Sequence, residues 1–171
     1  MKKLLAVLLF AASSVLLAGR LGFLRGKRPL DLGVKGGKLT SPRFGFRNSV
    51  ASQFETPKNL PVDLQKYYEI APIKLNSEPR KAFEKFKAIL KELPHTNVVT
   101  ENESYIYLEF ETTVMRYVDD VEFLLKEDES VIHLRSASRL GRKDYGKNRA
   151  RIEAIRTQFQ RIESTNLVDQ N

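Results

Sequence analysis

The chain has 171 residues and no cysteine, which excludes disulfide bonds, thiol nucleophiles and thiolate metal sites. Its length suffices for one domain with a core. The formal net charge is +8, and much of the excess lies in residues 1–50, which carry ten Lys and Arg and one acidic residue. Because this basic region flanks an apolar segment, it favours membrane topology or anionic headgroups over nucleic-acid binding.

The N-terminus carries a targeting signal. Residues 4–19 form an apolar run that follows two lysines, as in a signal peptide, and about 17 to 20 apolar residues can also span a bilayer. Cleavage after Ala18 leaves Leu16 where a small residue is preferred, so residues 1–19 are predicted to be a signal peptide or an uncleaved membrane anchor. We expect a periplasmic domain, or one anchored in the inner membrane on the exported side. Basic residues after the run favour the alternative, an anchored domain that faces the cytoplasm.

Residues 20–76 are rich in Gly, Pro, Lys and Arg and show little periodicity, which predicts an irregular lead-in. A helix is then expected, with Ser77 as its N-cap, Pro79 in its first turn and Pro94 at its end. Apolar residues at helical spacing predict a closing helix over about residues 146–162.

Between the two helices, apolar and polar residues alternate as in half-buried strands. Strands are predicted at residues 97–100, 104–114, 118–125 and 131–138. This order predicts an α+β fold: an antiparallel sheet of three to four strands with two helices on one face. We assign the domain to residues 77–164 and a frayed tail to residues 165–171.

Acidic residues form the first candidate site. Asp120 and Glu122 share one face of their predicted strand, and Asp119 lies on the other. Paired carboxylates can bind a divalent metal or act as acid and base, and His133 would be the second acid–base candidate. The structural alternative is that Asp120 pairs with Arg149 or Arg135 and holds strand to helix. We predict no metal site and no cofactor.

A second candidate site lies where the last strand passes through a glycine-bracketed loop into the closing helix. Arginines there could bind phosphate or carboxylate, and the helix N-terminus could add backbone N–H donors. The predicted ligand-binding residues are Arg135, Ser138, Arg139, Arg142, Asn148 and Arg149. The alternative is a solvated basic face with one or two internal ion pairs, in which Asp144 caps the helix.

Serine hydrolysis receives little support from the spacing. Ser136 lies three positions after His133, an odd spacing that places the two side chains on opposite faces of a strand, and there is no nucleophile elbow. Tyr105 and Tyr107 share a strand face with Glu109, and this face either lines a ligand groove or lies beneath the lead-in.

These motifs together are similar to a known family. They lie at residues 19–23, 26–29, 31–34, 37–39, 93–96, 117–123, 132–142, 144, 146, 148–149 and 151–153. The chain resembles the bacterial Domain of Unknown Function 1499 over residues 19–159. The resemblance implies an exported or membrane-associated bacterial domain without an assigned reaction. Family members typically carry two cysteines, for which Ser41 and Ser49 are the counterparts here, so disulfide or thiol chemistry is not expected to be essential to the shared fold.

From the sequence we therefore expect a membrane-associated envelope domain of unknown, non-enzymatic function. It would bind an envelope protein or an anionic ligand through the region from Arg135 to Arg149, and export argues against nucleic acid. The alternative is a hydrolase acting on an anionic envelope substrate, with Asp120 and His133 as its acid–base groups. The pattern says nothing about the oligomeric state.

Overall fold

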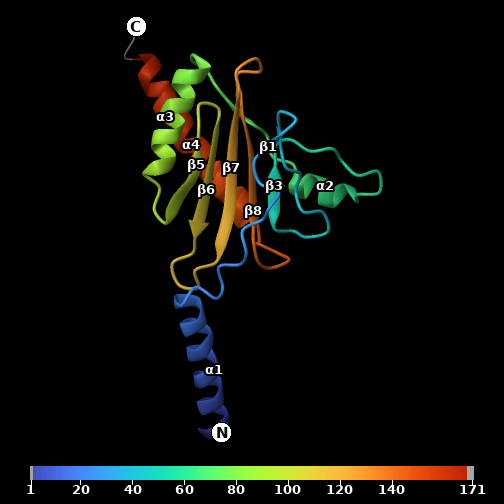
Figure 1. The fold of residues 1–171 in the computed structure, drawn as a ribbon, viewed down its shortest axis with the longest axis vertical. Helices are drawn as coiled ribbons and strands as arrows, with labels where there is room; N and C mark the ends of the chain where they lie inside the picture. Colours follow the sequence, from blue (N-terminus) through green and yellow to red (C-terminus); the bar gives the residue numbers. More distant parts are fainter. Residues whose placement is uncertain (1, 169–171) are drawn as a thin grey trace.

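The computed structural model describes residues 2–168, and the side chains of residues 2–164. An N-terminal helix projects from an α+β domain built on one large antiparallel sheet, beside a separate two-stranded sheet (Figure 1). The elements in chain order are α1 Lys2–Arg20, β1 Val34–Lys35, β2 Lys38–Leu39, β3 Ser49–Ala51, α2 Val62–Tyr68, β4 Ile73–Lys74, α3 Pro79–Lys91, β5 Thr96–Glu101, β6 Tyr105–Glu111, β7 Val118–Lys126, β8 Val131–Ser138 and α4 Lys147–Val168.

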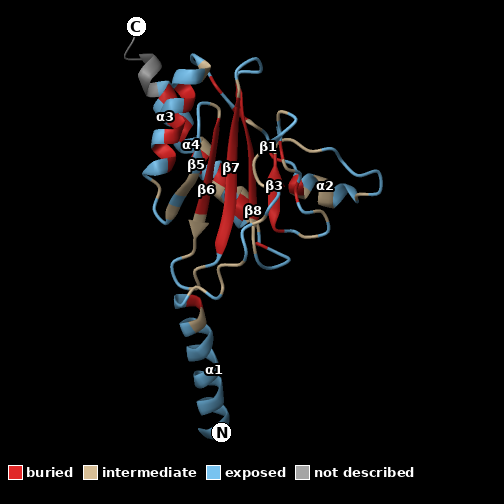
Figure 2. Cartoon of the chain, in the orientation of Figure 1, coloured by how far each residue is buried: buried red, intermediate tan, exposed pale blue. Residues whose placement is uncertain are grey.

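Helix α1 is exposed along almost its whole length (Figure 2). Its 19 residues have a mean hydropathy of 1.7 in the most apolar window. At ~1.5 Å per residue it is about 28 Å long, close to the ~30 Å thickness of a bilayer's hydrocarbon core. Among the described helices, α1 alone is long and apolar enough to cross a membrane, so it could serve as a signal or an anchor.

The sheet has six strands, in the order β3-β8-β7-β6-β5, with β4 also paired to β8. The strands expected from alternation are all present, and β8 begins and ends at the predicted residues. The sheet is nevertheless larger than the three to four strands that we predicted. The additional strands β3 and β4 come from residues assigned to the irregular lead-in. Each is only two or three residues long and is held by pairing to the edge of β8, so its own sequence carries no alternation signal.

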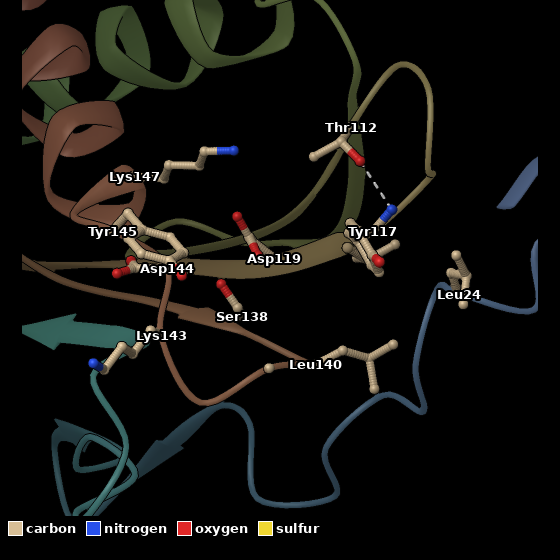
Figure 3. A pocket seen from close by; sticks show the side chains of 12 residues that line it. Leu24, Thr112, Tyr117, Asp119, Ser138, Leu140, Lys143, Asp144, Tyr145 and Lys147 are labelled. Carbon is tan, nitrogen blue, oxygen red and sulfur yellow. Dashed lines mark hydrogen bonds between the residues drawn. The ribbon is translucent and has the colours of Figure 1, made fainter. Parts of the chain in front are cut away.

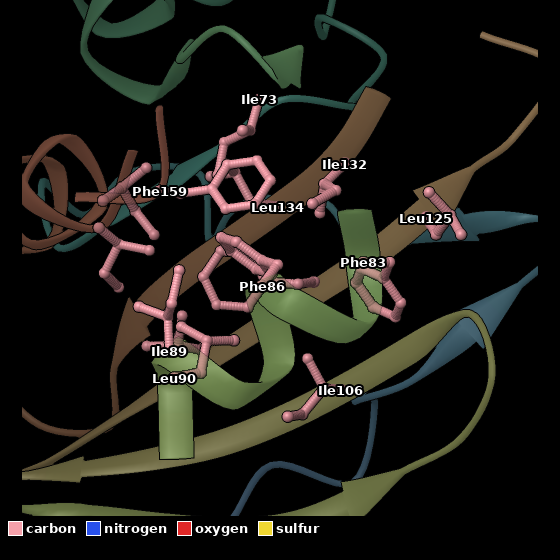
Figure 4. Packing of buried hydrophobic residues seen from close by; sticks show 14 of the residues in the cluster. Ile73, Phe83, Phe86, Ile89, Leu90, Ile106, Leu125, Ile132, Leu134 and Phe159 are labelled. Carbon is pink, nitrogen blue, oxygen red and sulfur yellow. The ribbon is translucent and has the colours of Figure 1, made fainter. Parts of the chain in front are cut away.

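Helices α3 and α4 cover one face of the sheet and enclose the apolar core. The Phe86 ring of α3 lies edge-on to Phe123 of β7, with centroids 4.9 Å apart. It also lies edge-on to Phe159 of α4, with centroids 5.1 Å apart (Figure 4). All three side chains have no measurable exposure. The prediction of two helices on one face is therefore confirmed, because their apolar positions meet the apolar side of β6–β8.

Helix ends differ from prediction in two places. The N-cap of α3 is Glu78, whose carboxylate accepts hydrogen bonds from the backbone N–H groups of Arg80 and Lys81 at 2.9 and 3.0 Å. Ser77 instead donates its hydroxyl to Glu163 of α4, 2.8 Å away, and so joins the two helices. Helix α4 continues to Val168, and the remainder of the tail predicted to fray lies outside the described residues.

Residues 20–39 run mainly over the opposite face of the sheet, and the chain then reaches the edge of the sheet at β3 (Figure 1). The tyrosine face of β6 lies beneath them, because Tyr105, Tyr107, Leu124 and Leu39 form a small buried cluster there. Of the two interpretations offered for the tyrosine face, the structure shows the one in which the lead-in covers it. Both faces of β6–β8 are consequently buried.

Candidate functional site

The face beneath the lead-in carries a mostly buried layer of charged and tyrosine side chains, called the ionic layer below. Its buried members are Tyr105, Tyr107, Glu109, Asp120, Glu122, Arg135 and Arg139, and the exposed Arg28 joins it from the lead-in. Strand register positions them, since Glu109 is the partner of Asp120, and Glu122 is the partner of Arg135. The three carboxylates of this layer thus face three guanidinium groups, and Arg25, which lies 3.5 Å from Glu109 and also pairs with Glu111, borders the layer.

Arg139 forms the centre of the ionic layer. Its Nη2 lies 2.7 Å from Oδ1 of Asp120 and its Nε 3.0 Å from Oδ2, a bidentate pair, and it also binds Glu109. Burial opposes the guanidinium charge, but hydrogen bonds to Asp120 and Glu109 raise the pKa of Arg139 above its ordinary value. Burial likewise opposes the charge of Glu109, but donors on Arg139 and Arg28 hold its pKa below the usual range. Each charge therefore stabilises the other.

Two tyrosines complete the layer. The Tyr105 hydroxyl donates to Oε1 of Glu122 at 2.8 Å, and the Tyr107 hydroxyl donates to Asp120. Burial, followed by the adjacent carboxylates, raises the pKa of both phenols. The backbone N–H of Gly33 also donates to Glu122, at 2.7 Å, so the lead-in is bonded directly to the layer that it covers.

The predicted partner of Asp120 was wrong. Arg135 lies directly opposite Glu122 and pairs with it, at 3.1 Å. Arg139 directly follows β8 and stands two residues beyond Ala137, the register partner of Asp120. It therefore projects to the same side as Ala137 and reaches Asp120. Arg149 lies elsewhere: its Nη2 binds backbone carbonyls at the end of α2, including that of Tyr67 at 3.0 Å.

The sheet separates the residues predicted to bind a ligand. Arg135 and Arg139 point into the ionic layer, whereas Ser138 and Asn148 lie on the helix face, joined by a 3.0 Å hydrogen bond. The Arg142 guanidinium lies over the Phe46 ring, 5.5 Å from its centroid. The six residues do not converge on one cleft, and of these six only Ser138 lines either of the two pockets described below.

The N-terminus of α4 is occupied by its own carboxylate. Asp144 accepts hydrogen bonds from the backbone N–H groups of Gly146 and Asn148, both at 2.9 Å, as the capping alternative predicted. Burial opposes the Asp144 charge, but these donors and the Tyr67 hydroxyl keep its pKa below the usual range. The backbone donors expected for an anion are therefore already used.

His133 lies in a chain of polar groups that sequence reasoning missed. Its Nδ1 lies 3.0 Å from Oγ of Ser52, and its Nε2 lies 3.2 Å from Oε2 of Glu129. Ser52 Oγ also accepts the backbone N–H of Leu134 at 2.8 Å, which extends the pairing between β3 and β8. Ser52 directly follows β3, so only the β3–β8 register reveals this contact. Neither of the two pockets described below is lined by these residues.

A pocket of about 450 Å³ opens at the end of the sheet from which α1 departs, between the β6–β7 loop and the β8–α4 loop (Figure 3). We call it the base pocket. Its lining residues are Leu24, Thr112, Tyr117, Val118, Asp119, Ser138, Leu140, Gly141, Lys143, Asp144, Tyr145 and Lys147. A second pocket, of about 350 Å³, lies between Arg25 and His95 and is lined mainly by polar residues, including Glu109 and Glu111.

The acidic side chains of the base pocket are neutralised or used as caps, and its lysines are not, so the pocket carries positive charge. Asp119 pairs with Arg151 of α4, and the Asp144 carboxylate caps that helix. Lys143 and Lys147 are exposed and form no ion pair with the described residues. In Figure 3 the Lys147 side chain extends from α4 toward the β6–β7 side, whereas Lys143 points away from the other lining residues. Lys147 is therefore the cation best placed to meet a ligand.

The wall of the base pocket is amphipathic. Leu24, Val118 and Leu140 supply apolar surface, and the Ser138 hydroxyl accepts from Asn148 while its own proton has no acceptor among the described residues. Tyr145 stands at the rim, 90% exposed, with a backbone φ of 55°. A left-handed conformation is costly for an aromatic residue, and such strain is concentrated at functional sites. The described residues contain no group of three or more His, Cys, Asp or Glu side chains arranged to hold a metal ion.

Comparison with known proteins adds the family. The model of the family described as "Protein of unknown function (DUF1499)" matches residues 42–159, more than half of the chain. The chain belongs to the DUF1499 family. The matched residues include β3–β8, α2, α3 and the first half of α4, whereas α1 and the first part of the lead-in precede them. Searches among curated proteins and solved structures found no match.

Proposed function

We propose that this DUF1499 domain is a membrane-tethered, non-enzymatic binding domain on the exported side, with α1 as its anchor. Its ligand would be an amphiphile with an anionic group, bound in the base pocket. The observation that carries this proposal is the combination of an apolar wall with an unpaired lysine, in a pocket beside the end of α1. An envelope protein remains the alternative partner.

This proposal changes the set of residues that we expect to bind the ligand. Arg135 and Arg139 hold the fold together in the ionic layer and are neutralised by carboxylates of the chain itself. Ser138 stays among the candidate ligand-binding residues, and Lys147 and Tyr145 join it. A ligand carboxylate or phosphate near Lys147 would gain a charge-assisted hydrogen bond, while its apolar part would cover Leu140.

Native mass spectrometry of the full chain, extracted from its own membranes, tests the proposal. We expect the wild type to retain a small molecule, and the Lys147→Glu variant to lose most of it. Lys58→Glu is the matched control, because Lys58 is also exposed but lies outside both pockets. Equal retention by both variants, or no retained molecule in the wild type, would contradict a ligand in the base pocket.

Hydrolysis is the second candidate, favoured by the Ser52–His133–Glu129 chain. A serine hydroxyl 3.0 Å from an imidazole can serve as a nucleophile. Labelling of Ser52 by a fluorophosphonate probe, lost in His133→Ala, would support this function. If Ser52 is not labelled while the protein is folded, the hydrogen-bonded groups Ser52, His133 and Glu129 only link β3 to β8 structurally. Asp120 is held by Arg139 and Tyr107, which leaves it poorly placed as the acid–base group suggested by the sequence.

A further inference from the structure

The two ends of the sheet differ in chemistry. The end near α1, called the base, comprises residues 20–28 and the loops at residues 112–117 and 139–146. Large apolar side chains are exposed on it: Leu21, Phe23, Val114, Tyr117, Leu140 and Tyr145. The opposite end, formed by the loops at residues 102–104 and 127–130, exposes acidic side chains and none of the large hydrophobic ones. Of these two ends, the base is the one that combines exposed apolar groups with basic ones.

Helix α1 is fixed to the base by direct contacts. Arg116 donates from Nη1 to the carbonyl of Arg20 at 3.0 Å, which caps the last turn of α1, and its Nε binds Glu111 at 2.6 Å. A Cβ atom at Gly19 would lie only 3.1 Å from the backbone of Met115, so the helix packs closely on the β6–β7 loop. If α1 spans a bilayer, these contacts turn the base toward the membrane surface (Figure 1).

We propose that the base rests on the bilayer and that the base pocket receives the headgroup of an anionic phospholipid from that leaflet. This inference rests on the proposed function, since it names the ligand of the same pocket. Exposed aromatic and aliphatic side chains beside basic ones are the composition that binds interfaces between lipid and water. Phe23 and Leu140 would enter the acyl boundary, and Lys147 would meet the phosphate.

The position of the pocket supports a lipid over a ligand from solution. Leu24 of the lead-in and Leu140 of the β8–α4 loop both line it, and Leu24 follows the end of α1 by only four residues (Figure 3). A lipid headgroup can enter from the end near α1 without leaving the interface. Ser138 and Lys147 then supply a hydroxyl donor and an ammonium group for the phosphate oxygens.

A tryptophan reporter tests the inference in the full chain, which contains no tryptophan of its own. Tyr145→Trp would place the reporter at the rim, and Val62→Trp would place a control on α2, where Val62 is also exposed. Both variants are reconstituted in nanodiscs of phosphatidylcholine with or without phosphatidylglycerol, with bromine on the acyl chains of one lipid at a time. Bromine quenches tryptophan only at short range.

We expect quenching at position 145 and none at position 62, with stronger quenching by brominated phosphatidylglycerol than by brominated phosphatidylcholine. Adding Lys147→Glu should remove this preference and lower the phosphatidylglycerol retained in native mass spectra about fivefold, the contribution of one basic group near an anionic surface. Lys58→Glu should change neither.

Four results would overturn the inference. Absence of quenching at position 145 in protein that co-purifies with nanodiscs would show that the base stands away from the bilayer. Equal quenching by both lipids, unaffected by Lys147→Glu, would show membrane contact without a bound anionic lipid. Retention of a small molecule other than phospholipid would leave the proposed function standing and refute the lipid, whereas failure to enter nanodiscs at all would refute the anchor itself.

Discussion

The two faces of the sheet are both buried, but they are stabilised by different chemistry. The helix face is apolar, with Phe86, Phe123 and Phe159 at its centre. The opposite face is charged, and it is covered by an irregular segment that donates to Glu122 and pairs with Glu109. An irregular segment buries little continuous apolar surface, so directed polar bonds, rather than area, position it on the sheet. The comparison predicts that the two faces respond differently to substitution and to pH.

The largest loss of stability is expected from the helix face. Phe86→Ala leaves a cavity between α3, β7 and α4, and such truncations cost about 3–5 kcal/mol. Thermal or denaturant unfolding of the detergent-solubilised full chain would measure the change. Phe54→Ala is a useful control, because that ring is only half-buried and lies in the lead-in. An equal loss in both variants would contradict a core centred on the helix face.

A similar but somewhat smaller loss is expected from Arg139→Met, about 3 kcal/mol, because it leaves Asp120 and Glu109 without their shared cation. A second substitution, Asp120→Leu, tests whether the loss comes from the ion pair itself. Arg139→Met combined with Asp120→Leu removes both partners of one pair, so the double variant should be less destabilised than the sum of the two single variants. Additive losses in this double-mutant cycle would show that the two side chains are energetically independent.

A change of pH perturbs the ionic layer without removing any atom, and we expect its effect on the free energy of unfolding to be smaller. The pKa of Glu109 is held below the usual range, so its contribution is present above the unfolded-state pKa of about 4.3 and is lost as pH falls through the lower folded value. The pKa of Tyr105 and of Tyr107 is raised, so their contribution is present below about pH 10 and is lost as pH rises through the higher folded value.

A plateau of stability between about pH 5 and pH 10 is therefore expected, with losses on both sides. Tyr105→Phe combined with Tyr107→Phe should flatten the alkaline side alone. Unfolding temperatures measured across the pH range check both limbs. An alkaline limb that is unchanged in the double variant would assign that loss to other groups.

The sequence predicted what depends on local pattern. Alternation from residue 104 to residue 138 located β6, β7 and β8, and strand parity placed Asp120 and Glu122 on one face. What depends on register between distant segments was missed. The choice of Arg139 over Arg135 as the partner of Asp120 follows from pairing between β7 and β8, and β3 is defined only by its edge contact with β8.

The base pocket could not be predicted for the same reason. Leu24, Thr112 and Tyr145 come from three loops that are far apart in the sequence and meet only at one end of the folded sheet. The unusual backbone at its rim carries no sequence signal either. Tyr145 adopts the left-handed conformation, which bulky residues rarely do, and its φ is known only from the structure.

The smallest expected change in stability comes from a substitution on the charged face, and it is a gain rather than a loss. Ser49 of β3 is fully buried, and its Oγ has no hydrogen-bond partner, so Ser49→Ala should stabilise the domain by about 1 kcal/mol. Ser136→Ala is the matched control: Ser136 is equally buried, but its Oγ is bonded to Asn148 and Arg151, and its loss should destabilise. Unfolding temperatures of the two variants check the contrast, and destabilisation by Ser49→Ala would mean that its hydroxyl has a partner. The resemblance places a family cysteine at this position, and a thiol, which behaves as a small apolar group when buried, suits a site without polar partners.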